Sequence, residues 1–141
     1  VGGHARAAPV RILLDTHVWW WWVTGESGLS AGQKRLLARV GPDDPAEVSD
    51  ISLWEIATLV SLGRLSISLP LRDWLESAAA PPLVQRRPIS PAVASEVASL
   101  PETFHRDPAD RIIVATARVH DATLLTRDRR IIDARLVPTV R

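Results

Sequence analysis

Apolar and polar positions along the chain follow two periodicities. Short, mostly apolar segments bounded by turn residues predict buried strands at 10–14, 48–51, 83–89, 122–126 and 136–140. Between them, apolar residues recur with helical spacing, which predicts helices at 16–23, 30–40, 52–62, 70–80, 107–119 and from 91 onward. This alternation of strands and helices favours an α/β fold with a parallel sheet covered on both faces.

Polar capping residues mark where several of these helices begin. Two capping boxes are predicted, one pairing Ser30 with Gln33 and the other pairing Ser52 with Glu55. Proline in the first helical turn marks two further starts, at Ser90-Pro91 and Asp107-Pro108.

Four consecutive tryptophans, residues 19–22, fall within the first predicted helix. At about 100° per residue their rings cover most of the helix circumference, so they cannot all face one core. We therefore predict that at least one ring is exposed or covered by another chain, and that this helix contributes to a homodimer contact or to a groove for a partner protein. The alternative is an irregular segment that buries all four rings.

Composition narrows the class of protein. The 141 residues suit one domain, which we expect to span 10–141 after a frayed end at 1–9. The absence of cysteine excludes disulfides, thiolate zinc sites and a cysteine nucleophile, and it fits a reducing cytoplasm. No apolar run approaches the roughly 18 residues of a membrane span. The net charge is +1, but sixteen of the seventeen basic residues are arginine, the side chain best suited to binding phosphate.

Four acidic residues are predicted to meet at one edge of the sheet. Asp15 ends the first strand, and Asp128 lies two residues beyond the strand at 122–126. The carboxyl ends of parallel strands gather at a common rim, where sites of α/β proteins form. Glu55 and Asp110 lie in the first turns of helices that open onto this rim. Each continues an apolar stripe that faces the sheet, where an unpaired charge is costly.

Each acid taken alone has a structural explanation. Glu55 can belong to a capping box, Asp110 can favour the helix dipole, Asp107 can be an N-cap and Asp128 a turn residue. Asp15 is the hardest to explain this way, because a carboxylate that ends a buried strand has little structural purpose. Their joint placement favours a functional site. Carboxylates that converge without cysteine or histidine suit Mg²⁺ or Mn²⁺ rather than zinc.

Four segments also resemble a known family, the PIN-domain toxins of the VapC type. They are ILLDTHVW at 12–19, ISLWEIA at 51–57, DPADRIIVATA at 107–117 and LLTRDRRI at 124–131, in the order that the family has them. The resemblance implies a three-layer α/β/α sandwich with a central parallel sheet. It also implies an endoribonuclease that uses Mg²⁺ or Mn²⁺ to activate the water that hydrolyses RNA phosphodiesters. Such a toxin is neutralised by a cognate VapB-type antitoxin.

The same resemblance assigns residues to the expected site. By motif position, the catalytic and metal-binding acids fall on Asp15, Glu55, Asp110 and Asp128, with possible support from Asp107, Thr126 and Ser52. Several arginines flank these acids in the sequence and are candidates for contacts with RNA phosphates, namely Arg111, Arg127, Arg129 and Arg130. Arg111 has a second interpretation, in which it holds a carboxylate in place.

Two other functions remain open from the sequence. One is a catalytically silent PIN-like module that binds RNA or protein. The other is a phosphatase or phosphoacceptor domain with Asp15 as nucleophile. A phosphatase of this kind needs a second aspartate two residues later, but His17 occupies that position. A phosphoacceptor domain needs a lysine late in the chain, but the sole lysine is Lys34. His17 itself is expected to have a structural or subfamily role, because activated water needs no histidine.

Overall fold

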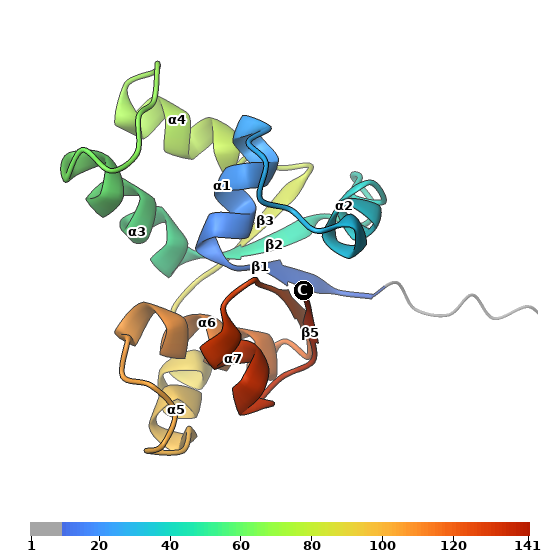
Figure 1. Ribbon diagram of the computed structural model, residues 1–141, viewed down its shortest axis with the longest axis vertical. Coiled ribbons are helices and arrows are strands. Elements are labelled where there is room, and N and C mark those ends of the chain that lie inside the picture. The colour runs from blue at the N-terminus through green and yellow to red at the C-terminus, as the bar shows by residue number, and fades with distance from the viewer. Residues whose placement is uncertain (1–9) are drawn as a thin grey trace, which may run out of the picture.

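Five parallel strands lie at the centre of the computed structural model, which describes residues 10–141 (Figure 1). The expectation of a frayed end at 1–9 lies outside the described residues. The sheet order is β3-β2-β1-β4-β5, and every neighbouring pair is parallel. The strands are β1 (Ile12–Leu14), β2 (Ala46–Ser49), β3 (Val84–Arg87), β4 (Thr123–Leu125) and β5 (Thr139–Val140).

Helices cover both faces of this sheet. Those on one face are α1 (Thr16–Thr24), α2 (Ala31–Leu37), α3 (Asp50–Ser61) and α4 (Leu71–Ala78). Those on the other face are α5 (Pro91–Ser99), α6 (Pro108–Val119) and α7 (Arg129–Ala134). Figure 1 shows the two groups on opposite sides of β1 and β2. The predicted three-layer α/β/α sandwich with a central parallel sheet is therefore confirmed.

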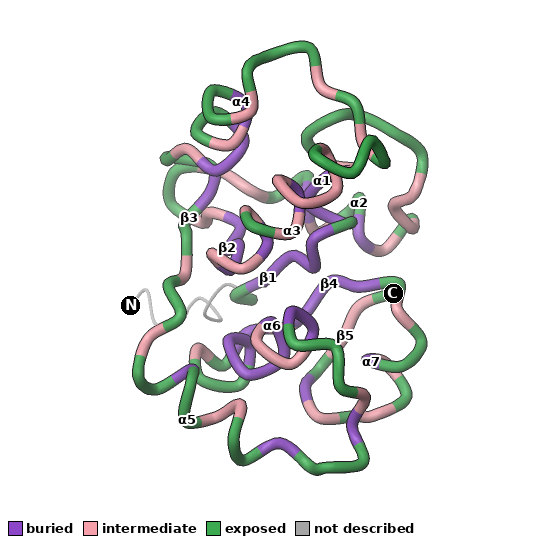
Figure 2. Tube along the Cα trace, turned by 90° about the vertical axis from the view of Figure 1, so that its left-hand side faces the viewer, coloured by how far each residue is buried: buried purple, intermediate pink, exposed green. Residues whose placement is uncertain are grey.

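The central strand β1 contributes to both halves of the core. Ile12 and Leu14 pack among the residues of α1 to α4, whereas Leu13 packs among those of α5 to α7. Successive side chains of a strand point to opposite faces, so a strand covered on both sides must be apolar throughout. Figure 2 shows this burial along β1, β4 and α6. In the part of the chain that the structure describes, no helix is long and apolar enough to cross a membrane.

Most predicted helix starts are confirmed, and one is wrong. Ser30 and Gln33 form the expected reciprocal capping box. Ser90 and Asp107 each cap a helix whose first residue is proline. However, α3 begins at Asp50, because the Ser49 hydroxyl accepts a hydrogen bond from the amide of Ile51 at 3.2 Å.

This earlier start of α3 changes two further expectations. The strand predicted at 48–51 ends at Ser49, and Ser52 is a buried residue inside the helix rather than its cap. Glu55 consequently lies in the second turn of the helix. The helix α7 was not predicted, and the strands expected at 83–89, 122–126 and 136–140 are shorter than their apolar segments.

The tryptophan run forms a regular helix, so the alternative of an irregular segment is wrong. Trp19 and Trp20 are buried, and both contact Trp74 of α4, with ring centroids 5.6 and 5.3 Å apart. Trp21 and Trp22 are only half-buried. The four rings thus divide between the core and the surface, as helical geometry requires. The contact with another chain stays a prediction.

Candidate metal and active site

A cleft of about 370 Å³ opens where β1 and β4 end. Five carboxylates line it, together with apolar and basic side chains. The acids are Asp15, Glu55, Asp107, Asp110 and Asp128. The structure therefore brings all four of the acids predicted from the sequence to one cleft, and it adds Asp107, which the sequence suggested as a helper.

Asp15 is held at the end of β1 by two hydrogen bonds. Its Oδ1 accepts from the amide of Thr16 at 2.8 Å, so Asp15 also caps α1. Its Oδ2 accepts from the hydroxyl of Thr126 at 2.7 Å, and that hydroxyl in turn accepts from the amide of Asp128 at 3.0 Å. Burial raises the pKa of Asp15, although the hydrogen bonds from Thr126 and Thr16 act in the opposite direction. The carboxylate is thus oriented before any ligand arrives.

Glu55 is joined to the start of α1 through two hydroxyls. Thr16 Oγ1 donates a hydrogen bond to Glu55 Oε1 and lies 2.8 Å from Ser52 Oγ. Since Thr16 has one hydroxyl hydrogen, Ser52 donates to Thr16. Burial raises the pKa of Glu55, the Thr16 bond opposes this, and the nearby charge of Asp15 adds to the rise. Thr16 was not predicted as a site residue, because its role depends on contacts with a helix more than thirty residues away.

Asp110 lies where negative charge is most concentrated. Its amide donates to Asp107 Oδ1 at 3.1 Å, so Asp107 is an N-cap as well as a cleft residue. Burial is the largest cause that raises the pKa of Asp110, to about 8. The repulsion of four neighbouring carboxylates adds to it, those of Asp15, Asp107, Asp128 and Glu55.

A histidine joins the acids, contrary to the expectation of a site without histidine. His105 Nε2 lies 3.2 Å from Asp110 Oδ2. Together with Asp128, these residues offer one ligand atom each, all within 4.8 Å of one another. His105 belongs to the segment before α6, where no periodic pattern of apolar residues indicated a direction for its side chain.

Asp128 is the acid whose charge is most strongly stabilised. It caps α7, and its Oδ1 accepts from the amide of Arg130 at 2.8 Å. Its Oδ2 lies 3.1 Å from Arg130 Nη2. Desolvation acts against the charged form, but the bonds from Arg130 outweigh it and lower the pKa of Asp128. The structural interpretation of Asp128 as a turn residue is therefore replaced by that of a helix cap.

The predicted RNA-contacting arginines separate into two groups. Arg127 and Arg130 line the cleft, and Arg129 is exposed beside them on α7. Arg111 differs, because its guanidinium donates to backbone carbonyls of the preceding segment, including Phe104 at 3.0 Å. Arg111 thus fixes that segment and neither contacts a carboxylate nor lines the cleft, so we remove it from the RNA-contacting set.

One wall of the cleft is formed by α1. His17 and Trp21 line it, with their ring centroids 5.9 Å apart. Gly28 packs directly under the Trp21 ring, and the Gly28 carbonyl accepts from Arg127 Nη1 at 2.7 Å. His17 is exposed and makes no contact that requires it to be structural, so the structure does not assign it that role.

The donor set of the cleft fits a divalent cation. Five carboxylates converge beside two arginines, and the repulsion among the carboxylates adds to burial in raising the pKa of Asp110. A divalent ion removes such repulsion, and oxygen-rich sites of this kind suit Mg²⁺ or Mn²⁺.

A five-stranded parallel sheet between two helical layers, with an acidic cleft at the ends of its central strands, defines an α/β/α protein with a candidate site for a divalent cation. The sequence profile of the PIN domain family matches residues 12–136. The chain belongs to the PIN domain family, and its relatives lie in the VapC group. It is 37% identical over 120 residues to Ribonuclease VapC22 of Mycobacterium tuberculosis, covering 85% of this chain and 88% of that protein.

Solved structures share the fold. FitAcB from Neisseria gonorrhoeae has a TM-score of 0.67 at 24% identity, covering 92% of this chain and 96% of that chain. VapBC2 from Rickettsia felis, bound to a DNA fragment from its promoter, has a TM-score of 0.67 at 14% identity, with 93% and 98% covered. The match to the PIN domain family and the identity to Ribonuclease VapC22 confirm the resemblance drawn from the four sequence motifs.

Proposed function

We propose that this protein is a metal-dependent endoribonuclease and the toxin of a toxin–antitoxin pair. The observation that carries the proposal is the meeting of Asp15, Glu55, Asp110 and Asp128 in one cleft. Its similarity to a protein named as a ribonuclease supports RNA as the substrate. The reaction is hydrolysis of a phosphodiester bond, which leaves a 5′-phosphate on one product and a free 3′-hydroxyl on the other.

Asp15, Asp110, Asp128 and Glu55 would hold Mg²⁺ or Mn²⁺. Such an ion, when bound, lowers the pKa of water and neutralises charge on a phosphodiester. The supporting residues act on these acids. Thr126 fixes Asp15, Ser52 acts on Glu55 through the Thr16 hydroxyl, and Asp107 fixes the start of the helix that carries Asp110.

The basic side chains at the mouth of the cleft would position RNA. Arg127 and Arg130 line the cleft and Arg129 lies beside it, where each can reach a phosphate. Contacts to phosphate fix the register of a nucleic acid without reading its sequence. We therefore expect these arginines to contribute to affinity for RNA of any sequence.

Two apolar surfaces suit protein partners. Trp22 and Val23 of α1 line a groove of about 460 Å³ together with Pro81 and Leu83, and we assign it to a VapB-type antitoxin. One structural neighbour is by its title a toxin–antitoxin complex from Klebsiella pneumoniae, which supports such a partner. Trp54 of α3 is 62% exposed and Leu62, the C-cap of that helix, is 60% exposed, and we assign the homodimer contact to this region. We expect the complex in the cytoplasm, where its RNA substrates are.

The proposal is tested by RNA cleavage with Mg²⁺ or Mn²⁺, with and without a chelator. Asp15→Asn is expected to lower cleavage by at least the roughly 10- to 100-fold typical of damage to a metal site. Asp43→Asn, at an exposed loop position outside the cleft, is the matched control and should cleave normally. RNA binding without cleavage by the wild type would instead indicate a silent binding module. Products with 2′,3′-cyclic phosphate ends would contradict the hydrolytic scheme.

A further inference from the structure

The imidazole of His105 occupies an unusual place among the acids of the cleft. Its Nε2 is buried and has no hydrogen-bond partner among residues 10–141, although Asp110 Oδ2 is 3.2 Å away. A buried polar atom without a partner costs free energy, so such an atom in a native structure calls for an explanation. A ligand bound between His105 and the acids would provide one.

The spacing of the three ligand atoms agrees with a shared metal ion. For an octahedral ion with bonds of about 2.1 Å, adjacent ligand atoms are roughly 3.0 Å apart and opposite ones roughly 4.2 Å. The His105–Asp110 distance of 3.2 Å matches adjacent positions. The candidate atoms of His105, Asp110 and Asp128 all lie within 4.8 Å of one another, so small side-chain rotations would bring them onto one ion.

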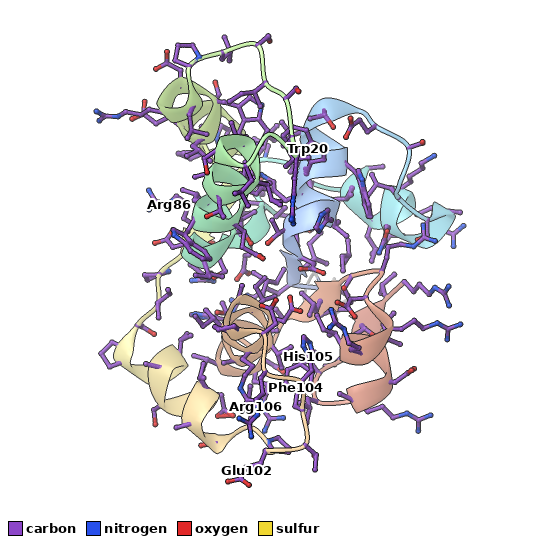
Figure 3. All side chains as sticks on the ribbon, turned by 60° about the vertical axis from the view of Figure 1, so that its left-hand side comes forward. Trp20, Arg86, Glu102, Phe104, His105 and Arg106 are labelled. Carbon is purple, nitrogen blue, oxygen red and sulfur yellow. The ribbon has the colours of Figure 1, made fainter. Side chains whose placement is uncertain are left out.

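The segment that presents His105 is held in place rather than loose. Arg111 donates from Nη1 to the carbonyl of Phe104 at 3.0 Å and to that of His105 at 3.4 Å. The Arg111 guanidinium also lies 5.8 Å from the centre of the Phe104 ring, which packs edge-on against His105. Figure 3 shows Phe104 and His105 on the segment that leads into α6, on the side that faces α7. Arg111 thus holds the backbone of this segment, and the imidazole of His105 lies between the Phe104 ring and Asp110.

We propose that His105 is a metal ligand, so that the ion proposed above is held by one nitrogen as well as by carboxylates, and the site prefers Mn²⁺ to Mg²⁺. Neutral imidazole is a common ligand of transition-metal ions, whereas Mg²⁺ prefers oxygen and keeps much of its water. This inference rests on the proposed metal-dependent function. It goes beyond it by naming a nitrogen ligand and the consequence for the choice of ion.

The test is electron spin-echo spectroscopy of Mn²⁺ bound to the purified protein, compared with titrations of Mn²⁺ and Mg²⁺. The wild type is expected to show a nitrogen coupling from imidazole, which changes when histidine is labelled with ¹⁵N. His105→Leu should lose this coupling and bind Mn²⁺ at least about tenfold more weakly, with a smaller effect on Mg²⁺. His105→Gln can supply an amide oxygen, so it should recover binding without recovering the nitrogen coupling.

Two further histidines provide matched controls. His17 lines the cleft, and His120 lies at the far end of α6, so His17→Leu and His120→Leu should keep the nitrogen coupling. A wild-type protein that binds Mn²⁺ without nitrogen coupling overturns the inference and leaves the proposed function standing. A nitrogen coupling that persists in His105→Leu, or one that is lost in His17→Leu, also overturns the inference and leaves the proposed function standing. Failure to bind either ion would overturn the metal-dependent function itself. A wild-type spectrum without nitrogen coupling overturns the inference whatever the folding of the variants, and circular dichroism of each variant checks its fold before its spectrum is compared.

Discussion

Hydroxyl groups set the orientation of two acids in the cleft. Thr126 donates to Asp15, and Thr16 donates to Glu55, so a carboxylate from β1 and one from α3 are each held by a buried threonine. A threonine hydroxyl can also accept, and Thr126 uses this capacity to bind the amide of Asp128. The acids are therefore ordered by neutral donors, which leave their negative charge available to a cation.

The raised pKa of Asp110 predicts how the free energy of unfolding depends on pH. Its pKa is raised from 3.8 to about 8 on folding, so the folded protein retains a proton that the unfolded chain releases. The free energy of unfolding of the metal-free protein should therefore fall as pH rises from about 4 to about 8. Asp110→Asn should weaken this dependence. At pH 9 the free energy of unfolding of the Asp110→Asn variant should be about 2 kcal/mol higher than that of the wild type, after allowance for solvent screening.

Chemical denaturation in the presence of a chelator, at several pH values, measures this difference. Repeating it with Mn²⁺ is the control, because a bound cation should stabilise the wild type more than the variant. An equal slope with pH for both proteins would show that Asp110 does not carry the repulsion described here.

Sequence reasoning found the acids of the cleft but not all their neighbours. Asp15 and Asp128 follow strands, and the ends of parallel strands can be predicted to meet. Thr16 and His105 could not be found in this way. Their contacts depend on how α1 approaches α3 and on the path of an irregular segment, and neither leaves a periodic pattern in the sequence. Arg111 was misassigned for the same reason, since its acceptors are backbone carbonyls of that segment.

Caps and turns decide where the helices around the cleft begin. Ser30, Ser90 and Asp107 were recognised because their partners lie within three residues. The start of α3 was misplaced because Ser49 and Ser52 are both plausible caps, and only the pairing of β2 with its neighbours ends the strand at Ser49. The helix α7 has six residues, too few for an apolar periodicity to show.

Gly28 is predicted to be essential for the loop that follows α1. A β-carbon at this position would lie 2.2 Å from the Trp21 ring, which is closer than atoms can approach. Gly28→Ala should therefore displace the loop or the ring and lower the free energy of unfolding by about 1–3 kcal/mol. Thermal or chemical denaturation measures the loss, and near-ultraviolet circular dichroism reports on the tryptophan environment.

Gly41→Ala is the matched control for this substitution. No atom lies within 4 Å of a β-carbon placed there, and the backbone of Gly41 is not in the left-handed region. The free energy of unfolding of the Gly41→Ala variant should stay near that of the wild type. If both variants lost the same stability, the tight contact between Gly28 and Trp21 would not be the cause.

The order of the strands brings together parts of the chain that are far apart in sequence. β1 pairs with β4 through Leu14 and Leu125, which places Asp15 next to Thr126, more than a hundred residues later. The α/β alternation predicted a parallel sheet, but not which strands are neighbours. The strand order was not predicted, because hydrophobic patterns specify the faces of a strand and not its partner.

Affinity for RNA should depend on salt through a local group of arginines, since the net charge of the protein is only +1. The slope of log affinity against log salt concentration is negative, and its magnitude should decrease by about 0.7 for each phosphate contact that is lost. Arg127→Gln, which removes a guanidinium that lines the cleft, should therefore show a weaker salt dependence.

Arg64→Gln is the comparison for this measurement, because Arg64 is exposed and does not line the cleft. It changes the net charge by the same amount. Fluorescence anisotropy with labelled RNA in a chelator separates binding from cleavage. Equal slopes for the two variants would indicate a general effect of charge rather than a contact made by Arg127.

The division of the tryptophan run between core and surface gives the molecule a built-in optical reporter. Trp19 and Trp20 are buried in the core, whereas the Trp21 indole lines the acidic cleft. Paramagnetic Mn²⁺ in that cleft should quench the emission of Trp21 far more than that of its two inner neighbours. In a protein in which the other five tryptophans are replaced by phenylalanine, the fluorescence intensity of Trp21 would then measure Mn²⁺ binding in the cleft without substrate or added dye.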